Sequence, residues 1–149
     1  MRYLKIVIGD CPVSYSIKIE SNLSSSENEL LHEKIIQFNF EKSGFVAKLF
    51  AILVRDEQNN IVGGLKSYCY GDGCFVDVLF LDEEVRGKGF GTQLMQLAEQ
   101  EAKRNECDFV HLDTFSFQAL PFYQKLGYCI YAELDYKEGV KRYYLKKEI

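Results

Sequence analysis

The stretch that decides the fold runs from Val85 to Lys103 and reads VRGKGFGTQLMQLAEQEAK, with three glycines and two cations ahead of a segment that has helical spacing. Each glycine costs conformational entropy and adds no side-chain packing, so Gly87, Gly89 and Gly91 need another reason to be there. A glycine turn leading from a strand into a helix is a frequent anion site, because unpaired amides converge there with the positive end of the helix dipole. The segment therefore predicts a phosphate-binding loop.

Two well-known phosphate motifs do not fit this segment. A P-loop needs a lysine and a hydroxyl residue directly after its last glycine, whereas Gly91 is followed by Thr92 and Gln93. A dinucleotide fingerprint counted from Gly87 and Gly89 reaches Thr92 where a third glycine is needed. Taken alone, the segment also leaves open a turn whose glycines only allow a helix to pack closely.

The chain as a whole has the size of one domain, and we expect residues 1–149 to form a single globular unit. Its 47% hydrophobic and 27% charged residues exclude a disordered or fibrous protein. A net charge of −4 without a long block of like charges argues against a nucleic-acid partner. No apolar run is long enough for a membrane span or a signal peptide, so we expect a cytoplasmic protein with no membrane partner. The sequence leaves a homodimer open.

The cysteines do not indicate a metal site. They are odd in number and scattered without a C-x-x-C pair, and only two histidines accompany them. Cys69 and Cys74 are near enough for a hairpin pair, but a disulfide is not expected in the cytosol. We therefore predict reduced, mostly buried thiols and no bound metal. The five are Cys11, Cys69, Cys74, Cys107 and Cys129.

The first half of the chain predicts a strand, a helix and a hairpin. Apolar residues alternate with polar ones over residues 13–21, which is typical of a half-buried strand. Serines and early acids then open a helical pattern that closes at Gly44. Two strands within residues 45–70 flank a polar turn at residues 58–60.

The second half continues with strands and helices in alternation. A nearly continuous apolar run over residues 74–84 predicts a central strand covered on both faces. The order of elements indicates one mixed sheet of six or seven strands in an α/β or α+β domain. After the central strand we expect a helix over 89–105, a strand over 108–115, a short helix over 116–127, and closing strands over 128–136 and 141–149.

Two motifs together resemble a known family. Arg86 to Gly91 satisfies the pattern [R/Q]-x-x-G-x-[G/A], its lead-in is LFLDEEVRGKGFG, and FSFQALPFYQKLGY follows downstream. These features are similar to the GNAT superfamily of acyl-CoA-dependent N-acyltransferases, and they cover about half the chain, from Phe75 to Tyr128. The resemblance implies a single domain with a mixed, mostly antiparallel sheet of six to seven strands, flanked by about four helices.

The resemblance also implies a cofactor site for acetyl-CoA, acting as cosubstrate. The strand at Leu79, Phe80 and Leu81 would pair its backbone with the pantetheine arm. Family members often carry an asparagine where this chain has Ser116, so we expect a weaker or altered cofactor contact there. The loop that would bind the pyrophosphate consists of Arg86, Gly87, Lys88, Gly89, Phe90, Gly91 and Thr92.

The implied reaction is acetyl transfer to a primary amine of a small molecule, an amino acid or a peptide, by direct attack in a ternary complex. Tyr123 occupies the position of the family's general acid, and a phenol is a reasonable proton donor to the departing thiolate. The resemblance implies that Tyr123 is a cofactor-binding residue as well. Its alternative role is helix packing with Phe122 and Tyr128. The alternative function is a non-catalytic acyl-CoA-binding or regulatory domain.

Asp77 is the candidate catalytic carboxylate, because it is the one acid inside the apolar strand. It would lie on the same face as Leu81 if the alternation is unbroken, and burial there would suit a general base. Two alternatives remain open, namely an anchor for the substrate ammonium and a structural hydrogen-bonding role. Asp113 on the neighbouring strand is a weaker alternative. We interpret the remaining nearby acids as a solvated turn, and these are Asp82, Glu83 and Glu84.

Overall fold

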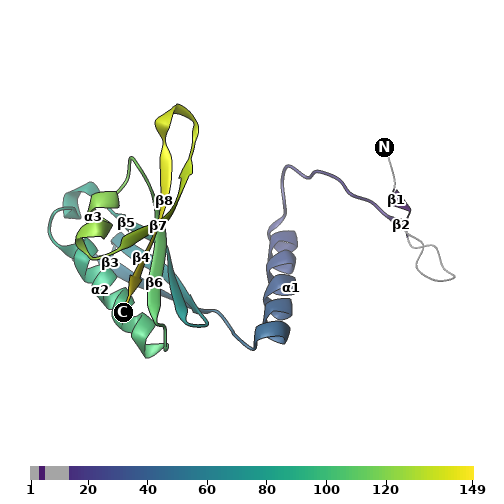
Figure 1. Cartoon of the computed structure of the whole chain (residues 1–149), viewed down its shortest axis with the longest axis horizontal. Helices are drawn as coiled ribbons and strands as arrows, with labels where there is room; N and C mark the ends of the chain where they lie inside the picture. The colour runs from purple at the N-terminus through teal and green to yellow at the C-terminus, as the bar shows by residue number, and fades with distance from the viewer. Residues whose placement is uncertain (1–3, 6–13) are drawn as a thin grey trace. The chain divides into compact units, whose positions relative to one another are not determined.

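The structure is a computed structural model that describes residues 4–5 and 14–149. The chain divides into two compact units, residues 1–43 and 44–149, and each is described by itself (Figure 1). In the first unit, β1 (Leu4–Lys5) and β2 (Ser14–Tyr15) form a two-residue antiparallel ribbon. The helix α1 (Ser25–Ser43) follows.

The helix α1 confirms the predicted helix, and its start is a reciprocal cap. The Ser24 hydroxyl accepts from the Glu27 amide at 3.3 Å, while the Glu27 carboxylate accepts from the Ser24 amide at 3.0 Å. The Ser24 hydroxyl also donates to the Glu27 carboxylate at 2.6 Å, and this bond first, with the bond from the Ser24 amide second, lowers the pKa of Glu27. Such a capping box satisfies two of the amides that a helix start leaves unpaired.

The strand predicted over residues 13–21 is wrong for most of its length. Val13 lies outside the described residues, β2 ends at Tyr15, and the side chains of Ile17 and Ile19 are 90% and 98% exposed. An alternating pattern produces a half-buried strand only where a neighbouring strand pairs with it. Here β2 pairs with β1 over only two residues.

The second unit contains a six-stranded sheet in the order β3-β4-β5-β6-β8-β7. Only β5 and β6 pair in parallel, so the prediction of a mixed, mostly antiparallel sheet is confirmed. Two helices belong to this unit, α2 (Phe90–Arg104) and α3 (Leu120–Lys125). Counting α1, the described residues hold three α-helices, which is fewer than the four expected. They also include two short 3-10 turns, η1 (Glu83–Val85) and η2 (Lys137–Gly139). The strands are β3 (Lys48–Arg55), β4 (Ile61–Tyr70), β5 (Gly73–Leu81), β6 (Phe109–Phe115), β7 (Cys129–Asp135) and β8 (Lys141–Glu148).

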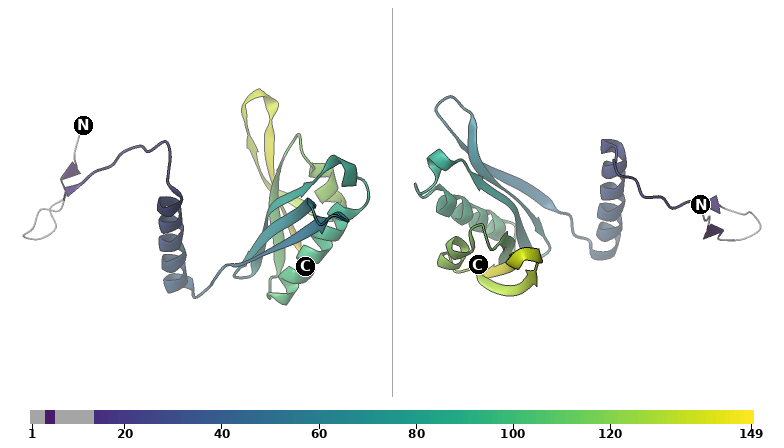
Figure 2. Two further views of the ribbon diagram at one scale, coloured as in Figure 1. Left: turned by 180° about the vertical axis from the view of Figure 1, so that it is seen from behind. Right: turned by 90° about the horizontal axis from the view of Figure 1, so that it is seen from above.

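The core lies between α2 and one face of the sheet (Figure 2). The helix buries Leu94, Met95, Ala98 and Ala102, as its amphipathic spacing predicts. The strands contribute alternate residues to the same cluster, including Val76, Val110, Leu112 and Leu145. This packing fixes the start of α2 against the end of β5.

The predicted hairpin is found as β3 and β4. The β3–β4 turn falls at residues 56–60, where the Asp56 carboxylate accepts from the Gln58 and Asn60 amides at 2.9 and 2.8 Å. Cys69 and Cys74 face each other across β4 and β5, and both are free thiols. Burial raises the pKa of Cys69 to about 11, so this thiol is protonated at neutral pH. Cys11 lies outside the described residues.

Candidate active site

The loop before α2 presents a row of unpaired amides. The Arg86 amide donates to the Glu83 carbonyl at 3.2 Å, and the next such bond is from the Gln93 amide to the Gly89 carbonyl at 3.1 Å. Between them, the six amides of residues 87–92 donate to no group in the part of the chain that the structure describes. Together with the α2 dipole, these amides give the loop a positive potential suited to an anion.

The three glycines of this loop serve two different purposes. Gly87 and Gly89 have φ angles of +72° and +86°, which L residues rarely adopt. Gly91 has no such requirement, but a Cβ there would lie 3.2 Å from Cζ of Phe122 in α3. The turn conformation therefore needs the first two glycines, whereas the third permits α2 and α3 to pack closely.

The strands β5 and β6 separate directly beside this loop. Their parallel pairing runs from Gly73 opposite Phe109 to Val76 opposite Leu112, and then stops although both strands continue. The opening leads into a cavity of about 640 Å³. Residues from β5, β6 and the segment leading into α3 line this cavity, so one edge of β5 is available to an extended ligand.

Asp77 is not buried, which corrects the sequence-based expectation. The β4–β5 register places Ser67 opposite Val76 and Lys66 opposite Val78, so Asp77 is the extra residue of a β-bulge. The bulge breaks the alternation on which the prediction relied. The Asp77 side chain is 43% exposed, lines the cavity, and lies 3.2 Å from the Lys66 ammonium.

The second half of β5 is likewise less covered than predicted. Val78 and Phe80 are about half exposed, although Leu79 and Leu81 pack against the core. Arg86 closes this end of the strand, because its Nε donates to the Leu81 carbonyl at 2.8 Å and its guanidinium lies 5.9 Å from the Phe80 ring centroid. The apolar run of β5 therefore lines a cavity where the sequence suggested a strand covered on both faces.

Tyr123 in α3 places a buried phenol at the cavity. The residue is 7% exposed, and its ring packs edge-on against Phe122 and Tyr128. Among the described residues no buried polar side-chain atom lacks a partner, and the Tyr123 hydroxyl makes no hydrogen bond. Its oxygen therefore reaches the open space of the cavity that the residue lines. Burial first, and the nearby Asp113 charge second, raise the pKa of Tyr123 to about 12.

Asp113 lies on β6 at the same cavity and is held by Arg142 of β8. The guanidinium donates to both carboxylate oxygens, with Nη2 2.8 Å from Oδ2. Arg142 also lies 5.3 Å from the centroid of Phe115 and 5.6 Å from that of Tyr144. The Asp113 side chain is 15% exposed, so this carboxylate is more enclosed than Asp77.

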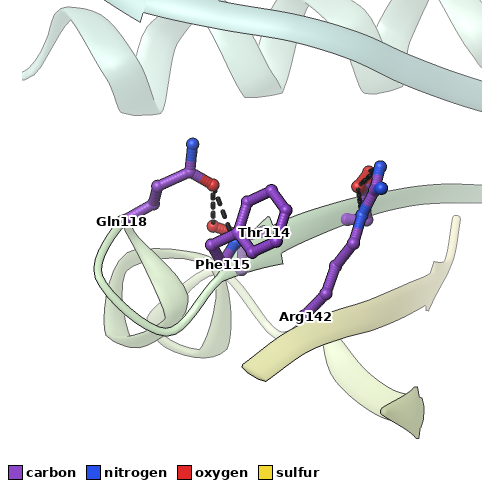
Figure 3. Close-up of polar contacts among 5 residues, drawn as sticks. Thr114, Phe115, Gln118 and Arg142 are labelled. Carbon is purple, nitrogen blue, oxygen red and sulfur yellow. Dashed lines mark hydrogen bonds and ion pairs between the residues drawn. The ribbon is translucent and has the colours of Figure 1, made fainter. Parts of the chain in front are cut away.

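Ser116 faces β8 and is not among the residues that line the cavity. Its amide donates to the Lys141 carbonyl at 2.8 Å, and its hydroxyl accepts from the Lys141 amide at 3.2 Å. The polar side chain that does line the cavity here is Gln118. Figure 3 shows Gln118 with its amide oxygen directed at Thr114 and Phe115.

Comparison with known proteins identifies the family of this chain. The sequence model of the acetyltransferase (GNAT) family matches residues 16–128. The chain belongs to that family. A blasticidin-S acetyltransferase from Streptomyces morookaense is 33% identical over 104 residues, which are 68% of this chain and 76% of the relative. The protein is therefore an acyltransferase of the GNAT family.

Solved structures agree with the GNAT fold. An acetyltransferase from Bacillus cereus is 32% identical, covers 89% of this chain and 98% of its own, and superposes with a TM-score of 0.72. An aminoglycoside 6'-N-acetyltransferase complexed with coenzyme A is 19% identical, covers 84% and 81%, and has a TM-score of 0.59. Because its sequence identity is only 19%, the similarity to the aminoglycoside enzyme is evidence for the fold alone.

The structure brings most of the predicted GNAT residues to one place. The loop residues 86–92 lie at the end of β5, and the cavity beside them is lined by Asp77, Leu79, Phe80 and Tyr123. Sequence reasoning missed Gln118 and Arg142. Arg142 gave no local signal, because only the β6–β8 pairing brings it to Asp113.

Proposed function

We propose that the protein transfers an acetyl group from acetyl-CoA to a primary amine of a small molecule, an amino acid or a peptide, by direct attack in a ternary complex. The observation that carries the proposal is the six-amide loop at residues 87–92, which opens next to the separated strands β5 and β6. A diphosphate fits the loop, because its oxygens can accept from several amides at once. An extended, amide-bearing arm fits the free edge of β5 at residues 77–81.

The thioester supplies the activated acetyl group when acetyl-CoA is bound, and the chain's own residues would then control protons and position. Tyr123 would donate a proton to the departing sulfur, because its buried phenol has a pKa of about 12 and is fully protonated at neutral pH. Arg86 would stiffen the end of β5 through its bond to Leu81. The acceptor's ammonium would release one proton to water in the open cavity, and the neutral amine would then attack the thioester carbon as the C–S bond breaks. The second proton that its nitrogen sheds would return to Tyr123.

We assign to Asp77 the role of anchor for the acceptor's ammonium group. Its present partner is the Lys66 ammonium, and this pair is well exposed on both sides, so it contributes little stability and can exchange. A substrate ammonium in the cavity could replace Lys66 as the partner of Asp77. The exposure of Asp77 speaks against the alternative, a general base tuned by burial.

The non-catalytic alternative is not favoured, because the two relatives that are most alike in sequence among those described above are named acetyltransferases. The name of the Streptomyces relative concerns an antibiotic, which supports a small-molecule acceptor for this chain. A screen of amines with acetyl-CoA, with release of the coenzyme thiol as the readout, tests turnover and identifies the acceptor together. No helix among the described residues is long and apolar enough to cross a membrane.

A further inference from the structure

We propose that Gln118 is a cofactor-binding residue whose side-chain amide donates a hydrogen bond to a carbonyl of the pantetheine arm. The inference rests on the proposed function and adds a contact that the sequence pattern assigns to another position, Ser116. The carboxamide oxygen of Gln118 is hydrogen-bonded within the protein, whereas its nitrogen is not.

The oxygen end of Gln118 is fixed by the loop between β6 and α3. Oε1 accepts from the Phe115 amide at 2.7 Å and from the Thr114 hydroxyl at 3.3 Å. Because a backbone amide can only donate, the atom that faces it must be the oxygen of the carboxamide. Thr114 is itself 3% exposed and accepts from the Ala119 amide at 3.3 Å, so the oxygen is held by a well-packed group.

The nitrogen end of Gln118 is directed away from this loop, as Figure 3 shows. Nε2 has no hydrogen-bond partner in the described part of the chain, and the residue lines the cavity between β5 and β6. A carboxamide is planar, so fixing its oxygen also fixes the direction of its two N–H donors. Gln118 is therefore a preoriented donor on the wall of the cavity.

The strand geometry places this donor on the side of β6 that faces β5. Successive backbone amides of a strand point to opposite edges. The Ser116 amide donates to Lys141 in β8, so the Phe115 amide points toward the other edge, where β5 has separated. Because Gln118 accepts from the Phe115 amide, its side chain occupies the edge of β6 with which β5 would pair if the two strands had not separated.

An extended pantetheine arm in this opening has two polar edges. One edge can pair with the backbone of β5, as the proposed function requires. The other edge faces β6, whose last amide on that side, Phe115, is already occupied by Gln118. The Nε2 group replaces that backbone donor and lies further into the opening, where a carbonyl of the arm can accept from it.

The test uses two substitutions with different effects on the loop. Gln118→Glu keeps an oxygen for Phe115 and Thr114 but removes the N–H donor, whereas Gln118→Met removes both. Each variant should raise the calorimetric Kd for acetyl-CoA about tenfold, the effect of one lost hydrogen bond. Only Gln118→Met should lower the thermal midpoint markedly. Gln124→Glu, at an exposed glutamine of α3 that does not line the cavity, serves as the matched control and should bind acetyl-CoA as the wild type does.

3'-Phosphoadenosine 5'-diphosphate, which keeps the diphosphate but lacks the pantetheine arm, separates this contact from the phosphate loop. Its Kd should be unchanged in both Gln118 variants. Wild-type affinity of both variants for acetyl-CoA, or an equal loss of affinity for acetyl-CoA and for this diphosphate, would overturn the assignment. Failure of the wild-type protein to bind acetyl-CoA would instead contradict the proposed function itself, so the two failures are distinguishable.

Discussion

Val76 of β5 and Leu112 of β6 form the last parallel pair between these strands, and the residues that follow them, Asp77 and Asp113, both line the opening beyond. The two carboxylates differ in their partners. Asp77 forms an ion pair with the exposed Lys66, whereas Asp113 accepts hydrogen bonds from both Nε and Nη2 of Arg142. The opening therefore has one exchangeable carboxylate and one fixed carboxylate.

Gly89→Ala should weaken acetyl-CoA binding by about tenfold or more, because an L residue resists the φ of +86° and the amides of the loop would move. Gly139→Ala is the matched control, since Gly139 has a φ of +76° and open space around its missing Cβ but lies outside the cavity. Both substitutions should lower the thermal midpoint to a similar extent. If calorimetry shows equal acetyl-CoA affinity for the two variants, the loop is not the phosphate-binding site.

Tyr123→Phe should leave acetyl-CoA affinity unchanged and lower kcat by about 10², the usual contribution of a positioned acid. Because the pKa of Tyr123 is raised to about 12, the phenol stays protonated as the pH rises to about 10. The wild-type rate should therefore rise with pH over this range as the amine loses its proton. A kcat within twofold of the wild type would assign Tyr123 to packing with Phe122 and Tyr128.

Asp77→Asn should chiefly raise KM for the acceptor, since the anchor for its ammonium is lost, and raising the pH should not restore the rate. A general base would behave differently. In that case kcat would fall, and the rate would recover at high pH, where more of the amine is already neutral. Full kinetics from about pH 7 to about 9.5 distinguish the two, given that amine pKa values lie near or above this range.

Asp113→Asn should lower both stability and kcat/KM, the latter about tenfold, because it weakens an enclosed ion pair and removes a charge from the cavity. The matched control is Glu99→Gln. Glu99 is held by Lys147 at 2.8 Å with 17% exposure, close to the 15% of Asp113, but does not line the cavity. Both variants should lower the thermal midpoint. Equal kcat/KM in the two variants would give Asp113 a structural role only.

The sequence predicted the parts of the fold that depend on local patterns. The helix α2 has an amphipathic repeat, and the β3–β4 turn has its polar residues, so both were found where expected. The loop at residues 87–92 was predictable because glycine, unlike other residues, tolerates positive φ. Local chemistry decided these elements.

Features that depend on pairing between distant segments were not predictable. The bulge at Asp77 arises from the register between β4 and β5, and no local signal in the strand marks it. The partnership of Asp113 with Arg142 requires β8 to pair with β6, across 29 residues of sequence. The pairing of the Ser116 backbone with Lys141, which directs Ser116 toward β8, likewise depends on a distant segment.

The most direct test of the proposed acetyl transfer measures thiol release from acetyl-CoA with a panel of primary amines, each matched to an alcohol of the same shape. The account predicts saturable release that depends on one class of amine, accompanied by the acetylated amine as product. Matched alcohols should give only the background rate, because a neutral amine is the stronger nucleophile. Thiol release that no amine raises above the background, or that matched alcohols raise equally, would contradict the account.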